Sequence, residues 1–492
     1  MAFEFIKSLI RKVGSMFNGN MMRNISEIAE SDNIASQRMM EAIELWIDMY
    51  QGNAPWLNKN PQSLGIPTLI AAEMARLVTI EMEVNVSGSP MADYLNEQLE
   101  QVRKDIRTNT EYACASGGIV FKPYICGDKI TTEVIQANAF YPFAYDNNLK
   151  ITGAYFLYRK WVGKEIYSRL EKHELKGTEY TITNRAFVSA YEEAIGRECQ
   201  LIEIEEWADI QPEVNISNVE SPLFSYFRIP LGNTIDLRSP IGVSVYSRSV
   251  DLIREADKQF QRLLWEYEGG ELAIDASEDA FKRVGGIPQL PEGKERLFRT
   301  NNLDTATASG NGLFSTFSPT LRDQNYLNGL NKILVAVEDS CNVSRGTISN
   351  PDVEARTATE LKILKDRKYA TVKDIQMALQ EALEDLISAM HTLAILYDLS
   401  PDGNYETTYV WDDSIIVDAE AERLRDQQEV NMGLMNKWEY RVKWYGEDEV
   451  TAKKMLSEMQ GPTDDEILGF DKEETEEEID DKEEPETEEE ET

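Results

Sequence analysis

A segment of forty-nine residues, from residue 352 to residue 400, contains no glycine or proline. Thr357 and Glu360 near its start have the spacing of a capping box. Apolar residues then recur at steps of three and four, which places side chains on one face of an α-helix: Leu361, Leu364, Val372, Ile375, Leu379, Leu383, Leu386, Met390 and Leu393. We expect a helix over residues 357–397, about 60 Å long at roughly 1.5 Å per residue. An average helix has about 11–12 residues, so a helix of this length indicates a strut in a large assembly.

The chain is strongly acidic, and part of the charge is concentrated near its C-terminal end. Its 492 residues carry a formal net charge of −38. Residues 464–491 hold eighteen acidic residues and two lysines, a net charge of −16, which leaves −22 on the remainder. A run of like charges with few apolar residues cannot bury enough surface to fold. We expect residues 462–492 to be a disordered acidic tail that serves solubility or docks a partner.

Length and cysteine usage place the chain among large intracellular proteins. A chain of this length is expected to hold two or more domains. The four cysteines, at positions 114, 126, 199 and 341, show no C-x-x-C spacing and are expected to be reduced thiols. No apolar run approaches the roughly twenty residues that span a bilayer. Residues 1–17 have an amphipathic helical pattern that favours packing against a neighbour, and Glu4 argues against a signal peptide.

The N-terminal half has an α+β pattern. Residues 24–60 and 91–116 are expected to be helical, and Gly117 with Gly118 stops the second stretch. The apolar period then changes to two in segments rich in β-branched and aromatic residues: 119–124, 130–136, 151–162 and 178–189. Residues 199–207 also alternate, between isoleucine and glutamate. These segments predict an antiparallel meander with one solvent-facing side.

The second half predicts two medium helices around a small insert. Residues 243–268 and 322–341 have helical apolar spacing, and the region between them is short, mixed and rich in turn residues. The two helices can therefore pack antiparallel with the insert at their far end. After the long helix, residues 405–417 are expected to form a strand and residues 419–460 two or more short helices.

The sequence offers little for catalysis. It contains no G-x-x-x-x-G-K-[ST] phosphate loop, and Gly310-Asn311-Gly312 is only a turn signal. His173 and His391 are the only histidines and are expected to be structural or solvated, so zinc sites and Ser-His-Asp chemistry have almost nothing to build with. We assign no catalytic, cofactor-binding or metal-binding residue and expect no enzymatic activity.

Basic residues on the two medium helices and the insert have two interpretations. They are either ordinary solvated faces with nearby ion pairs, or contacts to a polyanion or an acidic partner. Strong DNA binding scales with the number of phosphates neutralised. A chain this acidic is therefore expected to hold DNA only weakly.

Several short motifs occur together along the chain: Trp46 with Tyr50, Gly52 and Trp56; Tyr141-Pro142-Phe143 with Tyr145-Asp146; Pro230-Leu231-Gly232-Asn233; Ser239-Pro240-Ile241-Gly242-Val243-Ser244; Trp265-Glu266-Tyr267-Glu268-Gly269-Gly270; and Thr357-Ala358-Thr359-Glu360-Leu361. In this order and spacing, over roughly residues 1–460, the chain resembles the portal proteins of tailed bacteriophages, in particular those of long-tailed phages of Gram-positive hosts.

The resemblance implies an α+β ring subunit with a defined sequence of parts. These are an α+β wing (1–241), a first stem helix (242–268), a small α/β clip (269–321), a second stem helix (322–343), a tunnel loop (344–356), a long wing helix (357–397), a returning wing strand (398–418), a helical crown (419–461) and the acidic tail (462–492). Such subunits form a ring of about twelve copies around a channel.

The resemblance also implies sites and partners. The tunnel loop would face double-stranded DNA, bound weakly and without sequence specificity, through Arg345, Thr347, Ser349, Asn350, Asp352, Glu354 and Arg356. Lys258, Arg262 and Lys332 would line the channel. The clip would dock the packaging motor, the large terminase subunit, and later the head–tail connector through Lys282, Arg283, Lys294, Arg296 and Arg299. Major capsid and scaffolding proteins are the remaining partners, with no membrane. The ring would sit at one capsid vertex of the virion, after assembly in the host cytoplasm.

Two other hypotheses stay open. The first is a nucleic-acid-processing phage enzyme, such as a nuclease or a motor subunit, and the missing phosphate loop weighs against it. The second is another ring, connector or minor capsid protein. Connectors are usually much shorter and lack the order of helix, insert, helix, loop and long helix.

Overall fold

The computed structural model describes residues 34–57, 63–80, 82–191, 194–237, 239–277, 283–284, 287–288, 298–301, 314–350, 358–411 and 419–459. The chain forms two compact units, Met1–Asp412 and Asp413–Thr492. Both helices and sheets are present, so the predicted α+β class is confirmed. The expected amphipathic helix at 1–17, the capping residue Thr357 and the acidic tail lie outside the described residues.

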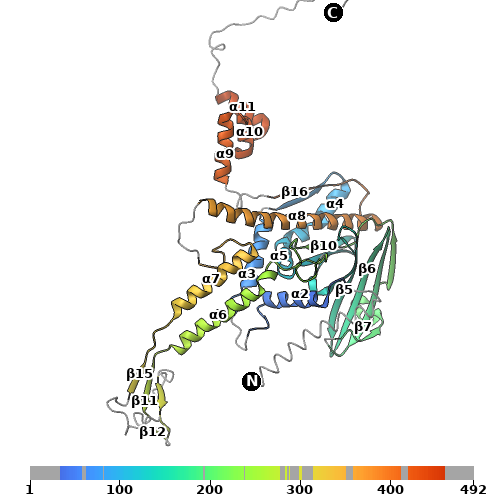
Figure 1. Cartoon of the computed structure of the whole chain (residues 1–492). Coiled ribbons are helices and arrows are strands. Elements are labelled where there is room, and N and C mark those ends of the chain that lie inside the picture. The colour runs from blue at the N-terminus through green and yellow to red at the C-terminus, as the bar shows by residue number, and fades with distance from the viewer. Residues whose placement is uncertain are drawn as a thin grey trace, which may run out of the picture. The chain divides into compact units, whose positions relative to one another are not determined.

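The larger unit holds most of the regular structure (Figure 1). Its helices are α2 (Gln37–Tyr50), α3 (Ile66–Thr79), α4 (Pro90–Gln98), α5 (Glu100–Ser116), α6 (Val250–Gly269), α7 (Asp323–Cys341) and α8 (Ala358–Leu396). Its strands are β1 (Glu83–Ser87), β2 (Gly118–Cys126), β3 (Lys129–Gln136), β4 (Phe140–Tyr145), β5 (Ile151–Val162), β6 (Glu165–Lys176), β7 (Glu179–Ser189), β8 (Arg197–Cys199), β9 (Glu213–Ser217), β10 (Ser225–Arg228), β11 (Ala273–Ser277), β12 (Arg283–Val284), β13 (Ile287–Pro288), β14 (Phe298–Asn301), β15 (Phe314–Phe317) and β16 (Glu406–Val410).

The main sheet is an antiparallel meander in the order β4-β5-β6-β7-β8, with β9 paired to the other end of β7. A second sheet has the order β10-β2-β3, and β1 pairs with β16. The strands predicted from period-two patterns are confirmed as β2, β3, β5 and β7. The sequence prediction missed β6, because Glu171 and His173 occupy inward positions where apolar residues would have shown the alternation.

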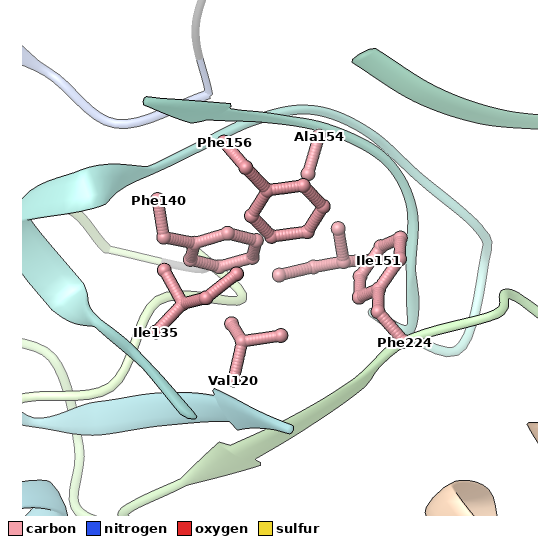
Figure 2. Packing of buried hydrophobic residues seen from close by; sticks show 7 residues of the cluster. All are labelled: Val120, Ile135, Phe140, Ile151, Ala154, Phe156 and Phe224. Atoms are coloured by element: carbon pink, nitrogen blue, oxygen red, sulfur yellow. The ribbon is translucent and has the colours of Figure 1, made fainter. Parts of the chain in front are cut away.

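A cluster of apolar side chains packs between the two sheets (Figure 2). It consists of Val120, Ile135, Phe140, Ile151, Ala154, Phe156 and Phe224. The Phe156 ring lies 5.8 Å from that of Phe140 in a stacked arrangement and 5.4 Å from that of Phe224 edge to face. Aromatic pairs of this kind contribute about 0.5–1.5 kcal/mol beyond their burial. The cluster therefore fixes β2, β3 and β10 against the start of the meander.

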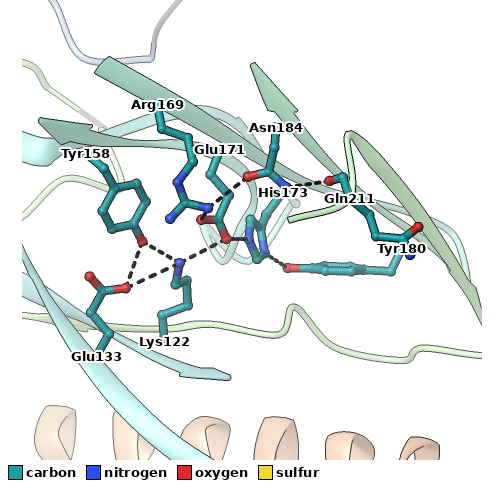
Figure 3. A network of polar contacts seen from close by, with 9 residues as sticks. All are labelled: Lys122, Glu133, Tyr158, Arg169, Glu171, His173, Tyr180, Asn184 and Gln211. Carbon is teal, nitrogen blue, oxygen red and sulfur yellow. Dashed lines mark hydrogen bonds and ion pairs between the residues drawn. The ribbon is translucent and has the colours of Figure 1, made fainter. Parts of the chain in front are cut away.

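A buried polar network lies beside this cluster (Figure 3). The Lys122 ammonium contacts the Glu171 carboxylate at 2.9 Å and the hydroxyl of Tyr158, and it lies 3.4 Å from Glu133. Arg169 contacts the other Glu171 oxygen at 3.1 Å. Lys122 and Glu171 are both buried. Two cations thus face two carboxylates, and the network is balanced only if the histidine beside Glu171 is neutral.

The contacts of His173 are those of a neutral ring. Tyr180 accepts a backbone hydrogen bond from Leu223, so its hydroxyl proton is free to go to His173 Nδ1, at 2.7 Å. Nε2–H then donates to Glu171 at 2.6 Å. Burial lowers the pKa of His173, against the raising effect of Glu171. Burial alone would raise the pKa of Glu171, but Lys122 and His173 hold it below its usual range. His173 is thus structural, as predicted from the sequence.

The long glycine- and proline-free segment forms α8, confirming the expected helix. The side chains of Leu361 and Leu364 lie outside the described residues, and the rest of the predicted apolar face is buried: Val372, Ile375, Leu379, Leu383, Leu386, Met390 and Leu393. The helix packs across α3, α4 and strands β2, β3 and β10 (Figure 1). Ser225 of β10 donates to the carbonyl of Ala382, and Gln376 donates to the carbonyl of Val78 at 3.4 Å. The helix therefore packs along the core through one face and leaves its other face, with Met377 63% exposed, in contact with solvent.

The prediction of alternating strand structure at residues 199–207 was wrong. Only Arg197–Cys199 is a strand, and two 3-10 turns follow, Leu201–Glu203 and Glu205–Trp207. A reciprocal capping box between Gln200 and Glu203 closes the first turn. Three-residue turns bring Ile204 and Trp207 together against Ala186, and this burial outweighs the strand preference of the sequence.

The two helical stretches predicted near the N-terminus are shorter or divided. The segment expected over 24–60 contains α2, which Ser36 caps by accepting from the Met39 N–H, and which ends before Gly52. Its parts at 24–33 and 58–60 lie outside the described residues. The stretch 91–116 forms α4 and α5, which meet at Leu99.

Gly117, which ends α5, lies where the backbone passes close to the backbone of Gly242. Gly117 has φ +99°, and a Cβ at this position would lie 2.6 Å from the carbonyl oxygen of Gly242. The Gly117 carbonyl accepts from the Ile229 N–H at 3.0 Å. The end of α5 and the segment leading into α6 thus touch through backbone atoms, which only glycine allows.

The smaller unit contains α9 (Ala419–Met432), α10 (Lys437–Tyr445) and α11 (Glu449–Met459), confirming the short helices expected there. Asp426 of α9 accepts from the Trp444 indole N–H at 2.8 Å and from Lys443 at 2.7 Å. Arg441 forms a paired contact with Glu447. Asp426 thus joins α9 to α10, and Arg441 holds the segment between α10 and α11.

Candidate functional site

The helices α6 and α7 form an antiparallel pair, shown side by side in Figure 1, with β11 and β15 continuing from their far ends. At the near end, the Ser249 hydroxyl lies 3.2 Å from the Cys341 thiol. At the far end, Glu266 accepts from the backbone N–H of Arg322 at 3.1 Å and from its guanidinium at 2.7 Å. The Arg322 side chain holds the pKa of Glu266 below its usual range. The pair is thus fixed at both ends.

A buried carboxylate fixes α6 to the rest of the unit. Asp257 accepts from the Trp56 indole N–H at 2.8 Å and from the Leu64 N–H at 3.1 Å. Burial raises the pKa of Asp257, and these two donors oppose that rise. The middle of α6 is therefore held by segments about two hundred residues earlier in the chain.

The turn after α7 is built on Glu338, whose side chain is 0% exposed. One carboxylate oxygen accepts from the N–H groups of Ile348 and Ser349, at 2.7 and 3.0 Å. The other accepts from the Ser349 hydroxyl at 2.7 Å and from the Gly346 N–H at 3.3 Å. Three backbone groups and one hydroxyl thus converge on one side chain, which folds residues 344–350 back onto α7.

Two further contacts hold the same turn at its edges. Arg345 donates to both oxygens of Asp339, at 2.7 and 2.6 Å. The Asn331 side chain accepts from the Asn350 N–H at 2.8 Å. Asn342 ends α7 in the left-handed conformation, with φ 56°. The turn is therefore a preformed platform at the point where the chain leaves the helix pair toward residue 351.

The structure places the predicted DNA-facing residues in different surroundings. Arg345, Thr347 and Asn350 are exposed, although Arg345 is engaged with Asp339. Ser349 is only 7% exposed and is bound to Glu338, so its side chain serves the turn itself. The predicted residues Asp352, Glu354 and Arg356 lie outside the described residues.

The predicted channel cations lie on both helices of the pair, Lys258 and Arg262 on α6 and Lys332 on α7. Lys258 pairs with Glu255 at 2.7 Å, and Arg262 donates to Gln259 at 3.4 Å. Lys332 of α7 is exposed. It lies two residues, or roughly 200° of helical rotation, from the buried Leu330, and so on another side of α7.

Of the predicted motor-docking cations, Arg283 lies on β12 and Arg299 on β14. The strand β14 pairs in parallel with β11, whose other edge carries β15. Lys282, Lys294 and Arg296 lie outside the described residues. The insert between α6 and α7 therefore contains short strands, in keeping with its mixed, turn-rich sequence.

Sequence reasoning missed Glu338, the residue that organises the turn. A signal was present: Glu338 lies four residues after Leu334 and three before Cys341, on the apolar face of the helix. It also precedes a run of serine, glycine and threonine rich in N–H and O–H donors. An acid at a core position followed by such a run indicates a carboxylate-centred turn.

No group of three or more metal-ligating side chains occurs in the part of the chain that the structure describes. Likewise, none of the described helices is both long and apolar enough to cross a membrane.

The comparisons with known proteins agree with this arrangement. No curated protein matches the chain. The family model for phage portal proteins of the SPP1 Gp6-like type matches residues 85–479. This match covers both helices of the pair, the insert, the turn, the long helix and the C-terminal helices, which is most of the chain. The chain therefore belongs to the SPP1 Gp6-like family of phage portal proteins.

Proposed function

We propose that about twelve copies of this chain close into a ring at one capsid vertex and form the channel through which DNA enters during packaging and leaves during ejection. The observation that carries the proposal is the order of α6, a small strand-bearing insert, α7, a fixed turn and the long helix α8, within a chain of the portal family. Such a subunit is structural, and hydrolysis of ATP belongs to a separate motor.

The parts of the chain take roles within this ring. The pair α6 and α7 forms the stem, and residues 269–321 form the clip that docks the large terminase subunit and later the head–tail connector. Lys282, Arg283, Lys294, Arg296 and Arg299 are the clip cations proposed for this docking. The sheets and α8 form the wing, in contact with capsid and scaffolding proteins, and α9 to α11 form the crown. The motifs shared with portals of long-tailed phages support a Gram-positive host.

The turn at 344–350 gives the tunnel loop a fixed origin. Glu338 and Asp339 hold its beginning against α7, so residues 351–356 start from a defined point in every copy of the ring. Symmetry also multiplies single charges: one exposed Lys332 per subunit becomes a belt of about twelve cations. Contacts of this kind are independent of sequence and are screened within about 10 Å at 0.1 M salt, which suits DNA that must slide.

Imaging of the purified full-length protein by electron microscopy, with mass measurement of the intact particle, tests the proposal. The expected result is a ring with a central channel and a mass of about twelve subunits. A protein that stays monomeric at all concentrations, including with its capsid and scaffolding partners, would refute it. Metal-dependent DNA cleavage or ATP hydrolysis by the purified chain would favour the enzyme hypothesis instead.

A further inference from the structure

One face of α6 carries a large aromatic side chain that is exposed to solvent in the single subunit. Trp265 is 65% exposed although it lies on a helix whose other side is packed. With Lys258, Gln261, Arg262 and Tyr326 it lines a groove of about 420 Å³ between α6 and α7. Isolated apolar residues are common on surfaces, but a large aromatic ring beside a hollow indicates a contact site.

Other large apolar side chains are exposed along the same end of the helix pair. Leu321 and Leu327 are 38% and 40% exposed, and Leu272, just after α6, is 53% exposed. Leu321 reaches the backbone of Gly270, where a Cβ would collide with it. Exposed apolar side chains are therefore present both at the groove and near the junction with the insert.

The two cations that line the groove indicate the chemistry of a partner that binds there. Among the described residues, no carboxylate lies within ion-pair distance of Arg262, whose hydrogen bond goes to the neutral Gln259 amide. The Lys258 ammonium forms an ion pair with one exposed glutamate, Glu255. A guanidinium beside an indole ring favours a partner that brings both a carboxylate and apolar contact.

A second copy of this chain has that chemistry. The chain carries a formal charge of −38, of which −22 lies outside the acidic end, so the surface of any copy is mainly acidic. Closed rings are built from heterologous contacts, in which one face of each subunit meets a different face of the next. A groove that holds Arg262, for which the described residues provide no ion pair, on an otherwise acidic chain is complementary to such a neighbouring face.

We propose that the groove formed by Lys258, Gln261, Arg262, Trp265 and Tyr326 is one half of the contact between neighbouring copies of this chain. This inference rests on the proposed ring and goes beyond that proposal by naming a surface through which neighbouring subunits contact each other. It also assigns Lys258 and Arg262 to the interface, in place of the channel wall expected from the sequence, and leaves Lys332 as the exposed stem cation of α7.

The test compares two groove variants with matched controls on the full-length protein. Trp265→Ala is paired with Trp161→Ala, because Trp161 is similarly exposed, at 60%. Arg262→Glu is paired with Lys104→Glu, an exposed cation on α5. Ring formation is followed by native mass spectrometry over a concentration series, and thermal unfolding of each variant verifies its fold. The groove variants are expected to need at least tenfold more protein to form rings, and the controls less than threefold.

A photo-crosslinking residue in place of Trp265 gives a second measurement that does not depend on weakening the ring. Irradiation is expected to give covalent dimers and higher multimers of the chain on a denaturing gel. The proposal is overturned if both groove variants assemble like wild type, or if the crosslinker captures added DNA and not a second copy. Wild-type protein that never forms rings would remove the proposed function as well, whereas wild-type rings with unaffected variants remove only this contact.

Discussion

Replacing Glu338 by glutamine tests whether one carboxylate holds the turn at 344–350. The amide keeps one oxygen, which can still accept from the N–H groups of Ile348 and Ser349. These two bonds lose the charge of the acceptor, which is worth about 1 kcal/mol each. The new NH₂ group cannot accept from the Gly346 N–H, 3.3 Å from the present oxygen, and that loss adds about 1 kcal/mol.

We therefore expect Glu338→Gln to weaken the turn by about 3 kcal/mol, which is roughly a hundredfold in the opening equilibrium. Hydrogen exchange measured by mass spectrometry on peptides covering residues 344–350 reads this equilibrium. Three amides that are now bonded to Glu338 would exchange about a hundred times faster, since exchange follows local opening. The rest of the fold would keep its protection, because the lost bonds lie within one turn.

The neighbouring residue supplies the control. Asp339→Asn makes the same carboxylate-to-amide change, but the Asp339 and Arg345 side chains are 39% and 36% exposed. Exposed pairs contribute about 0.2–1 kcal/mol, so this variant should change exchange less than roughly fivefold. Equal exchange rates in Glu338→Gln and wild type would show that the turn is held by other contacts, and the argument for a fixed loop origin would fail.

Three further predictions concern the sheets. Lys122→Met removes a cation from the buried network and should lower the free energy of unfolding by about 3–5 kcal/mol. The control Lys129→Met changes an exposed ion pair and should alter the free energy of unfolding by less than about 1 kcal/mol. Urea denaturation measures both values. The pKa of His173 in the folded chain lies below its unfolded value of about 6.5. The neutral His173 ring therefore contributes stability above that pH, and this contribution is lost as the pH falls. Urea midpoints that stay constant from pH 7 to 5 would contradict this prediction. Gly117→Ala should destabilise the chain far more than Gly127→Ala in thermal unfolding, because both have positive φ but only Gly117 faces a backbone oxygen.

The helices that the sequence predicted well share one property. In α6, α7 and α8 the apolar period runs along the whole helix apart from the buried acids Asp257, Glu266 and Glu338, and α6 ends at Gly269, one residue after the predicted end. Tertiary contacts there reinforce the local preference, so pattern and structure agree. The strand β6 shows the opposite case, because its inward positions include Glu171 and His173, and their burial depends on Lys122 forty-nine residues earlier. No local pattern can reveal such a pairing.

The candidate site was predictable only in outline. The place of a loop between α7 and α8 followed from composition, but the role of each loop residue did not. The run from Ser344 to Ser349 has the composition of a solvated loop, and the burial of Ser349 depends on a carboxylate one helical turn before the end of α7. The groove at Trp265 could not be predicted from the sequence either. Helical spacing shows which side of α6 is apolar, but it does not show that the exposed Trp265 ring lies beside Arg262.

Carboxylates in this chain divide into two groups, and the division bears on passage of DNA. Glu338, Asp257 and Glu266 are buried, and each accepts from donors in segments that the helix pair must hold in place. The surplus that gives the charge of −38 must therefore lie mainly on the surface, where water and salt screen it. A surface of this sign repels phosphates, and tight binding would require many cations in contact with the backbone. An acidic chain can therefore surround DNA without gripping it, provided that the few cations it presents to the channel are single residues repeated by symmetry. In the proposed ring, the cations of α6 that lie beside Trp265 would face the next subunit, where a carboxylate of that copy would neutralise them.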